Sequence, residues 1–404
     1  MLITIVAAVV ALLVAGGLSF GRFAKSDKWA ATVTPLASII GSGFLISGPL
    51  LAREFGSAAF WAMAVLLLLA YAVGGVIRWN IIHVENYLAE KTFNDPVAWV
   101  ARLTQAALAG AFAVSVAYYL KLLAEFAMKP FAVDHAWHSM VSNVSVTAII
   151  LILTMLAFGG DLRRVEQVAH GTVSIKIGII AGLLAGIGTW WVINFGTTPD
   201  LPPAILSWKS VPMLLGLLIT VQGFETSRYL GHAYSQTMRV QTMRHAQWIA
   251  GAIYLAFLAL LTPFLGDAAK AEGVAGIVDI MRMVAAPLVI FVLIGALSSQ
   301  LSAAVADSIG SGGLMNEVSQ RKVSVPAAFA IASALAIAVV WLTDPFEVVA
   351  ISSRAFALFY ALQCLLALLV SFRTNVGSWW LRSGIAVIGI VCLVATVIGA
   401  PAEG

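Results

Sequence analysis

Long apolar blocks fill most of the chain, and short polar connections separate them. A helix needs about 20 apolar residues to cross a bilayer core, and the short alternating segments typical of a transmembrane barrel are not seen. We therefore predict an all-α, polytopic membrane protein with about twelve transmembrane helices. The approximate spans are 2–20, 31–52, 57–82, 97–126, 141–158, 169–194, 210–234, 246–265, 278–313, 325–343, 346–371 and 383–400.

Two of these spans carry a glycine-marked interruption near the middle. The first interruption consists of Ile40, Gly41, Ser42, Gly43 and Phe44, and the second of Gln222, Gly223, Phe224 and Glu225. Lipid tolerates a broken helix only where protein surrounds the freed backbone or where the break lines a polar cavity. Interrupted spans at corresponding places in two halves of a chain indicate the substrate site of a transporter. We predict that both interruptions bind the substrate.

The spans between the first and the last fall into two blocks of nearly equal length. Residues 31–195 hold the first five spans and residues 196–372 the next five, and each block opens with its interrupted span. Because five is an odd number, the two blocks have opposite orientations in the membrane, which makes them an inverted repeat. Residues 1–30 add an N-terminal helix with a basic loop, and residues 373–404 add a C-terminal helix.

Composition and charge agree with a membrane protein and exclude other classes. Hydrophobic residues make up 61% of the chain and charged residues only 10%, against about 25% charged residues in a soluble domain. The net charge of +4 is small and lies mostly in loops, so the expected partners are a lipid bilayer and a small solute rather than nucleic acid. The chain is expected to act as a monomer or a homodimer.

The basic residues predict an orientation. Of the 23 lysines and arginines, about 14 fall in connections on one side and about 4 in connections on the other, which places the N-terminus outside. The first span has no basic residues before it and a long apolar run, so we interpret it as a retained helix rather than a signal peptide. Short connections favour a bacterial inner membrane.

Three features together resemble the amino acid–polyamine–organocation (APC) superfamily. Its first core helix resembles the stretch from Gly41 to Leu45, its sixth resembles Gly223-Phe224-Glu225, and its eighth resembles the serine-rich end of span 278–313. The resemblance implies a LeuT-like five-plus-five inverted repeat with one extra helix at each end. It also implies a transporter rather than an enzyme, with no cofactor beyond H⁺ or Na⁺ as the coupling ion.

Each interruption has a functional and a plain interpretation. Unwinding at Gly41 and Gly43 would free N–H groups for an anion such as a carboxylate, whereas the plain alternative is close helix packing through small residues. Carbonyls freed at the second interruption can bind an ammonium group, and Phe224 can wall or gate the pocket. Glu225 is a membrane-embedded carboxylate and is functional by default; its alternative is an ion pair with Arg228.

Coupling residues are implied by the resemblance. Proton-coupled relatives carry a lysine where Lys176 lies, in place of a sodium ion, and an ammonium among apolar residues must lose its proton, reach water or find a partner. Sodium-coupled relatives use adjacent hydroxyls, here Ser298 and Ser299, with a carbonyl, here that of Gly295; such oxygens suit hard cations. Both serines can also accept hydrogen bonds from the lysine. The presence of Lys176 favours protons, while a snorkelling lysine and a polar seam between helices stay open.

Other charges lie in or near the spans. Lys121 and Glu125 are four residues apart, so we expect them to pair on one helix face. For Asp307 we expect an interhelical ion pair, with a place in an inner vestibule as the alternative.

These observations predict a secondary active transporter, most simply a proton-coupled symporter of a small amine-bearing solute such as an amino acid. The alternatives are a sodium-coupled transporter, a nucleobase transporter in which Phe44 and Phe224 stack on the ring, and a non-transporting sensor or partner subunit. Relatives that carry manganese or iron use Asp, Asn and Met where this chain has Ser42 and Gln222, which argues against a metal. No Walker A sequence occurs, so ATP-driven pumping is not expected.

Overall fold

The chain folds as a bundle of helices. The computed structural model describes residues 1–22, 25–90, 95–131, 135–159, 173–196, 201–231 and 233–401, and every regular element in those ranges is helical. Within the described residues, 10 stretches are long and apolar enough to cross a membrane, and two of them, Asp27–Ala89 and Gln236–Lys270, each join two helices. The all-α membrane fold is therefore confirmed, whereas the count of about twelve spans stays a prediction.

The helices match most of the predicted spans in extent, except 210–234 and 278–313, which the structure divides. In chain order they are α1 (Leu2–Phe20), α2 (Asp27–Phe55), α3 (Ala59–Ala89), α4 (Pro96–Met128), α5 (His135–Gly159), α7 (Val173–Ile193), α8 (Ser210–Gly216), α9 (Gln236–Leu261), α10 (Leu265–Lys270), α11 (Ile277–Val284), α12 (Leu288–Val318), α13 (Val325–Leu342), α14 (Pro345–Thr374) and α15 (Trp379–Ile398). Short 3₁₀ segments are η2 (Gly56–Ala58), η3 (Leu218–Val221), η4 (Phe224–Leu230) and η5 (Thr262–Phe264).

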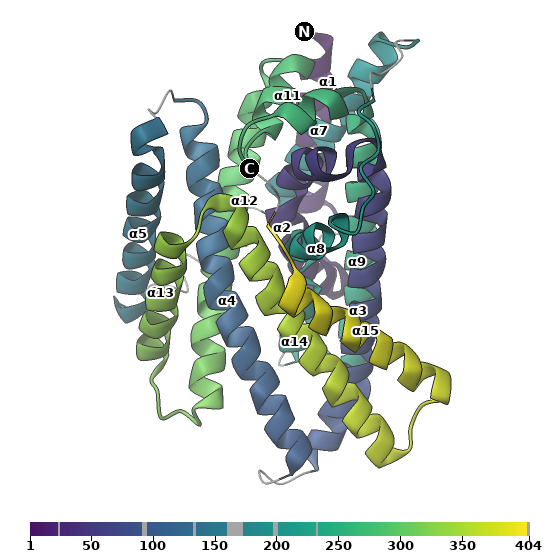
Figure 1. Cartoon of the computed structure of the whole chain (residues 1–404), viewed down its shortest axis with the longest axis vertical. Helices are drawn as coiled ribbons and strands as arrows, with labels where there is room; N and C mark the ends of the chain where they lie inside the picture. Colours follow the sequence, from purple (N-terminus) through teal and green to yellow (C-terminus); the bar gives the residue numbers. More distant parts are fainter. Residues whose placement is uncertain are drawn as a thin grey trace.

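The helices pack in two groups. One group contains α2, α3, η4 and α9, and the other contains α4, α5, α12 and α13. In Figure 1, α5 and α13 lie side by side at the left, and α3 and α9 lie at the right. Each group thus takes two consecutive elements from each predicted block, as related blocks would do. The block boundaries themselves stay a prediction.

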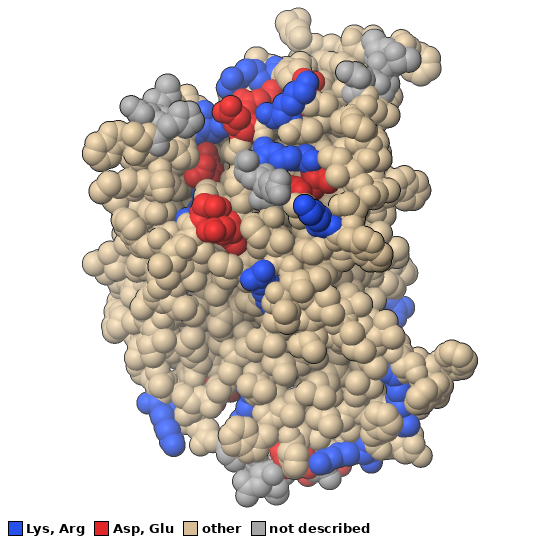
Figure 2. All heavy atoms as spheres, viewed as in Figure 1, with Lys and Arg blue, Asp and Glu red and all other residues tan. Residues whose placement is uncertain are grey.

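The surface agrees with a bilayer environment. Large apolar side chains such as Leu12, Trp61 and Leu342 are exposed. On the face shown in Figure 2, charged side chains lie over the upper half and at the lower end, and the band between these two groups carries few charges. Exposed apolar surface on this scale is unfavourable in water and favourable in lipid.

Glycines on α7 let the N-terminal helix approach closely. Gly178, Gly182 and Gly186 are four residues apart and therefore lie along one helix face. A Cβ atom added at Gly178 would lie 2.6 Å from the carbonyl oxygen of Ala11, and one at Gly182 would lie 2.5 Å from that of Ala7. Small residues at this spacing allow backbone-to-backbone helix packing. The additional helix α1 is thus packed against the last helix of the first block.

The single span predicted over 278–313 is wrong. Helix α11 ends at Val284, and α12 begins at Leu288 after Pro287 in the N-cap position. Ala285 is extended and Pro287 has no N–H to donate, so α11 stops before this proline and a new helix begins after it. Pro35 and Pro49, by contrast, lie inside α2. The serine-rich end of that span belongs to α12.

Candidate functional site

The second predicted interruption is present. Helix α8 ends at Gly216, η3 covers Leu218–Val221, Gln222 is extended, and Gly223 has a φ of 120° before η4 begins. A positive φ of this size is accessible to glycine and strained for other residues. The chain is therefore unwound where the glycine lies.

Side chains replace the helical hydrogen bonds that the break removes. The Ser353 hydroxyl on α14 accepts from the Ile219 N–H at 2.9 Å and donates to the Gly216 carbonyl at 2.7 Å. The Glu225 carboxylate accepts from the Gly223 N–H at 3.0 Å through Oε2. Buried backbone groups must be paired. Ser353 and Glu225 supply partners for the groups that the unwound segment between Gly216 and Phe224 leaves without helical hydrogen bonds, and they thereby stabilise it inside a membrane.

The first predicted interruption is wrong, because α2 is helical from Asp27 to Phe55. Its glycine instead permits close packing. A Cβ atom at Gly43 would lie 2.1 Å from the carbonyl oxygen of Thr220, and one at Gly223 would lie 2.5 Å from Ser38 Oγ. The backbones of α2 and the unwound segment therefore touch, which is the plain interpretation of small residues.

A tyrosine from α9 joins the two segments. The Tyr254 hydroxyl lies 3.0 Å from the Ile39 carbonyl of α2 and 2.5 Å from the Thr220 carbonyl of η3, close enough to donate to either. Ile40 and Phe44 are buried beside this junction, and Phe44 packs edge-on against Tyr254 with ring centres 5.7 Å apart. The side chain of Ser42 lies outside the described residues.

The polar side chains of the break are buried and only partly paired. Gln222 donates to the Tyr119 hydroxyl at 2.9 Å, and Glu225 Oε2 also accepts from the Tyr360 hydroxyl at 3.0 Å. Gln222 Oε1 and Glu225 Oε1 accept no hydrogen bond from the described residues, although the two side chains are only 1% and 0% exposed. Phe224 stacks on Tyr360 with ring centres 5.5 Å apart. Two acceptors and an aromatic wall thus lie at one break.

The alternative ion pair between Glu225 and Arg228 is not formed. The Arg228 guanidinium donates to Gln363 Oε1 on α14. Its carbonyl accepts from Arg239, which also pairs with Glu85 of α3 at 2.6 Å. Because Arg228 belongs to this separate network, Glu225 is left without a cationic partner among the described residues.

Lys176 lies where three helices meet. Its ammonium donates to the Ser302 hydroxyl on α12 at 2.7 Å, and it lies 3.8 Å from where a Cβ atom at Gly41 of α2 would be. The lysine is 5% exposed, so it is not snorkelling to a surface. Ser302 in turn donates to the Ser299 carbonyl at 3.0 Å.

The residues predicted for a sodium ion lie near Ser302 on α12 but make other contacts. Ser298 donates to the Ile294 carbonyl at 2.6 Å. Gly295 faces α7, where a Cβ atom would lie 3.1 Å from Ile179 Cγ2. Ser299 is buried, but the lysine bonds to Ser302 instead. Sequence reasoning missed Ser302, although its place one turn beyond the two serines was a usable signal.

Asp307 contacts a serine hydroxyl, and among the described residues it does not form the expected ion pair. The Ser115 hydroxyl of α4 lies within hydrogen-bond reach of both Asp307 Oδ2 and the Phe112 carbonyl. This arrangement keeps a second carboxyl group inside the protein on α12.

Three tyrosines were also missed. Tyr119, Tyr254 and Tyr360 contact the break from α4, α9 and α14, and each is fully buried. Tyrosine in a membrane protein is usually found near the interfaces. Its occurrence deep inside a span was the signal that could have identified these residues.

Comparison with known proteins gives one family. The family described as APC superfamily transporter matches residues 21–399. A protein of Aquifex aeolicus (strain VF5), named only "Uncharacterized protein", is 38% identical over 353 residues, which cover 86% of each chain. Two crystal structures of mutants of the Eremococcus coleocola manganese transporter have TM-scores of 0.54 and identities of 12% and 13%, and they cover 93% of this chain and 87% of theirs. At such identities the likeness concerns the fold alone.

Proposed function

The chain belongs to the APC superfamily of transporters, and on that premise we propose that it is a proton-coupled transporter of a small amine-bearing organic solute. Family membership and the helical fold establish a membrane transporter. The solute class and the coupling ion are the proposed part.

The proposal of an amine-bearing solute is based on two buried acceptor atoms at the break that have no hydrogen-bond donor in the described part of the chain. Glu225 Oε1 and Gln222 Oε1 are buried and lack donors among the described residues. An unpaired buried acceptor costs about 1–3 kcal/mol. An ammonium group supplies three donors and a positive charge, so it can donate to such an acceptor and neutralise the carboxylate. The stacked Phe224 and Tyr360 rings offer an apolar wall that also attracts cations.

The structure does not show the carboxylate-binding site that an amino acid would need at Gly41 and Gly43. Because α2 is helical past Gly41 and Gly43, its N–H groups there are engaged in the helix. Recognition of a carboxylate at this position requires α2 to open at another stage of the transport cycle. The proposal therefore rests on the amine, with an amino acid as the solute that the family resemblance implies.

Lys176 is the proposed proton carrier. It bonds to α12 of one helix group and lies against α2 of the other, so a change in its charge alters the contact between the groups. A sodium ion held by Gly295, Ser298 and Ser299 would lie beside this ammonium, and like charges at short range repel. The lysine therefore favours protons over sodium.

A thermal-stability screen tests the solute class. The purified protein is melted with alkylamines, amino acids, nucleobases, Na⁺ and Mn²⁺; a ligand at about 100 times its Kd adds about 2.7 kcal/mol to the folded state. We expect amines or amino acids to raise the melting temperature, and the Glu225→Gln variant to lose that shift. A shift produced only by nucleobases or by Mn²⁺, the ion named for the structural neighbours, would contradict the proposal.

Uptake into proteoliposomes tests the coupling. Lys176→Ala should abolish accumulation driven by an acidic exterior while solute exchange continues, because exchange needs no net proton movement. Ser298→Ala is the matched variant on the alternative sodium site and should leave acid-driven uptake in place. Retained acid-driven accumulation in Lys176→Ala would refute the role of the lysine. Binding without any movement of solute would instead favour a sensor.

A further inference from the structure

Two arginines on neighbouring helices lie close together. Arg78 belongs to α3 and Arg244 to α9, and these helices pack against each other (Figure 1). The Arg78 guanidinium donates to Gln247 Oε1, and Gln247 lies three residues after Arg244 on the same helix face. The two positive charges are near enough to repel each other. We call these two residues the α3–α9 arginines.

Arg78 is surrounded by neutral groups. Besides Gln247, it contacts the Tyr71 carbonyl at 3.4 Å, and its guanidinium lies over the Tyr71 ring, 4.8 Å from the ring centre. Arg78 is only 7% exposed, and it forms no ion pair with the described residues. A charged side chain in a membrane span is expected to have a partner, because an uncompensated charge away from water is unfavourable. The described protein does not supply that partner.

Both arginines keep donors that the protein does not use. A guanidinium has five N–H groups in a planar fork, and the described residues accept two of those of Arg78. A Cβ atom added at Gly75 would meet only Arg78 Nη2 within 4 Å, at 3.6 Å, so this side of the guanidinium is not covered. Arg244 is exposed and makes no hydrogen bond or ion pair with the described residues.

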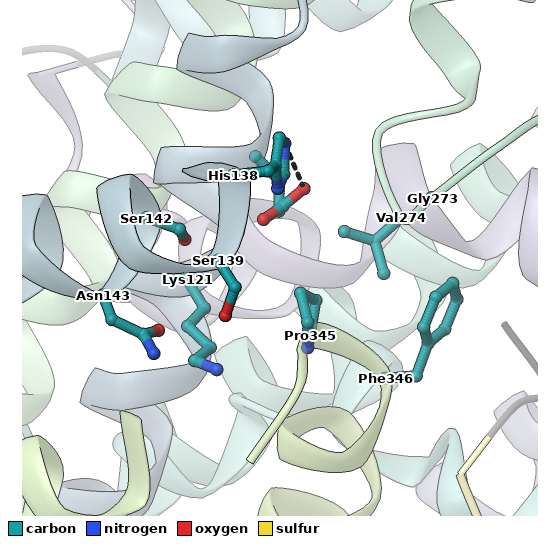
Figure 3. A pocket seen from close by; sticks show the side chains of 10 residues that line it. Lys121, His138, Ser139, Ser142, Asn143, Gly273, Val274, Pro345 and Phe346 are labelled. Carbon is teal, nitrogen blue, oxygen red and sulfur yellow. Dashed lines mark ion pairs between the residues drawn. The ribbon is translucent and has the colours of Figure 1, made fainter. Parts of the chain in front are cut away.

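Lys121 of α4 shows how another buried cation of this protein is compensated. Its ammonium donates to the Thr343 carbonyl and lies among three carboxylates, those of Glu125, Asp344 and Glu347. Figure 3 shows Lys121 in a cavity beside His138. The direct pairing expected between Lys121 and Glu125 is not formed, since Glu125 instead lies 3.7 Å from His138 Nε2. Among the described residues, the α3–α9 arginines have no comparable set of acids.

The surroundings of the α3–α9 arginines are typical of a surface in contact with lipid. Trp248, four residues after Arg244, is 56% exposed, and Ile82, four residues after Arg78, is 40% exposed. Residues four apart share a helix face, so exposed apolar side chains flank both arginines. Both lie toward the end where α3 finishes and α9 begins, which the charge bias predicts to be cytoplasmic. Tryptophan is enriched at the headgroup level.

We propose that the α3–α9 arginines bind the phosphate group of an anionic phospholipid. Guanidinium forks match phosphate oxygens in geometry and charge, and basic sites between membrane helices on the cytoplasmic side suit such headgroups. The phosphate lies between Arg244 and the uncovered side of Arg78, and the acyl chains contact exposed apolar side chains of α3 such as Leu68. The lipid thereby joins α3 and α9 without taking part in solute binding.

Lipid binding to the purified protein tests the site. Delipidated protein in neutral detergent is titrated with phosphatidylglycerol or with zwitterionic phosphatidylcholine, and bound lipid is counted by native mass spectrometry. We expect phosphatidylglycerol to be retained in preference to phosphatidylcholine. Arg244→Gln should weaken the binding of phosphatidylglycerol about fivefold, because a basic residue beside anionic lipid contributes on that order. This variant loses no contact within the described protein, so its fold should be unaffected.

Matched variants separate the site from general charge attraction. Arg321→Gln removes an exposed arginine from the connection between α12 and α13, on the same predicted side of the membrane, and should leave lipid retention unchanged. Arg78→Gln should weaken the binding of phosphatidylglycerol by the same factor as Arg244→Gln. Its melting temperature is compared with that of the unmodified protein, because Arg78 also holds Gln247.

Three results would overturn the proposal. Equal retention of the two lipids, or retention of phosphatidylglycerol that Arg244→Gln does not weaken, would eliminate the site. An equal loss in Arg244→Gln and Arg321→Gln would show attraction to net charge alone. A rise in melting temperature with inorganic phosphate in phosphatidylcholine micelles, as large as that with phosphatidylglycerol, would indicate a site for a soluble anion instead of a lipid.

Discussion

Two glycine-marked spans meet at the centre of this protein, and only one of them is broken. Helix α2 continues through Gly41 and Gly43, whereas the span that starts at Ser210 unwinds between Gly216 and Phe224. Glycine occurs in both, so its weak helix propensity does not explain the difference.

The difference lies in what pairs the backbone after the helix opens. At the broken span, Ser353 pairs an N–H and a carbonyl, Glu225 pairs another N–H, and Tyr254 reaches a further carbonyl. In α2 the backbone stays helical through Gly41 and Gly43, although Pro35 and Pro49 have no N–H to donate, and the missing side chain of Gly43 allows close approach to Thr220. A membrane helix breaks where neighbouring side chains replace its hydrogen bonds.

The largest effect is expected at the glycine of the break. Gly223→Ala combines a φ of 120° with a Cβ atom 2.7 Å from the Ile39 backbone nitrogen. Backbone strain and the clash with α2 should destabilise the protein by about 3 kcal/mol or more. Melting temperature measures this, with Gly251→Ala as the control, because a Cβ atom there meets nothing within 4 Å. Equal melting of the two variants would show that the break is not held in this conformation.

The next effect concerns the serine that replaces helical bonds. Ser353→Ala leaves the Ile219 N–H and the Gly216 carbonyl without their partner, which should cost about 2 kcal/mol. The neighbouring Ser352 is equally buried, and its hydroxyl makes no hydrogen bond with the described residues. Ser352→Ala should therefore change the stability much less. If both variants melted alike, the pairing account of the break would be wrong.

A smaller effect is expected for the tyrosine between the two spans. Tyr254→Phe keeps the ring that packs on Phe44 and removes only the hydroxyl shared by the Ile39 and Thr220 carbonyls. The cost should be about 1 kcal/mol, read as a modest fall in melting temperature. Because the hydroxyl joins the segments, hydrogen exchange at the Thr220 amide should also accelerate. If Tyr254→Phe lowered the melting temperature but left hydrogen exchange at the Thr220 amide unchanged, the hydroxyl would not be what joins the two segments.

The fold was predictable because periodic features determine it. Apolar length predicted the helices, and the glycine–glutamate stretch at Gly223 predicted the real break. The break expected in α2 could not be judged from its own residues, because the outcome depends on partners such as Ser353, more than 300 residues away in sequence from Gly43. Pro287 was a local signal against a single span over 278–313. It was missed because the residues on both sides of it are apolar.

The candidate site was predictable only in part, because its charged residues stand out in the sequence and their partners on other helices do not. Glu225 and Lys176 stood out as charges in apolar spans, and the structure buries both. Their partners, Tyr360 and Ser302, come from other helices, and single-sequence patterns do not specify which helices meet. Pairing by spacing alone failed for Lys121, because the carbonyl of Thr343, in the connection between α13 and α14, competes with a carboxylate on its own helix.

The smallest effect on stability is expected for Gly41→Ala, and this variant tests the difference between α2 and the broken span most directly. Gly41→Ala adds a methyl group whose nearest neighbour is Lys176 Nζ at 3.8 Å, an ordinary contact distance. Alanine is a better helix former than glycine by about 1 kcal/mol, so a continuously helical α2 should become equally or slightly more stable. We also expect solute uptake to persist, in contrast to Gly43→Ala, whose Cβ atom would overlap the Thr220 backbone. A Gly41→Ala protein that melts higher but no longer transports would show that α2 must unwind at this glycine during the cycle. The two spans would then differ in when they open rather than in whether they open.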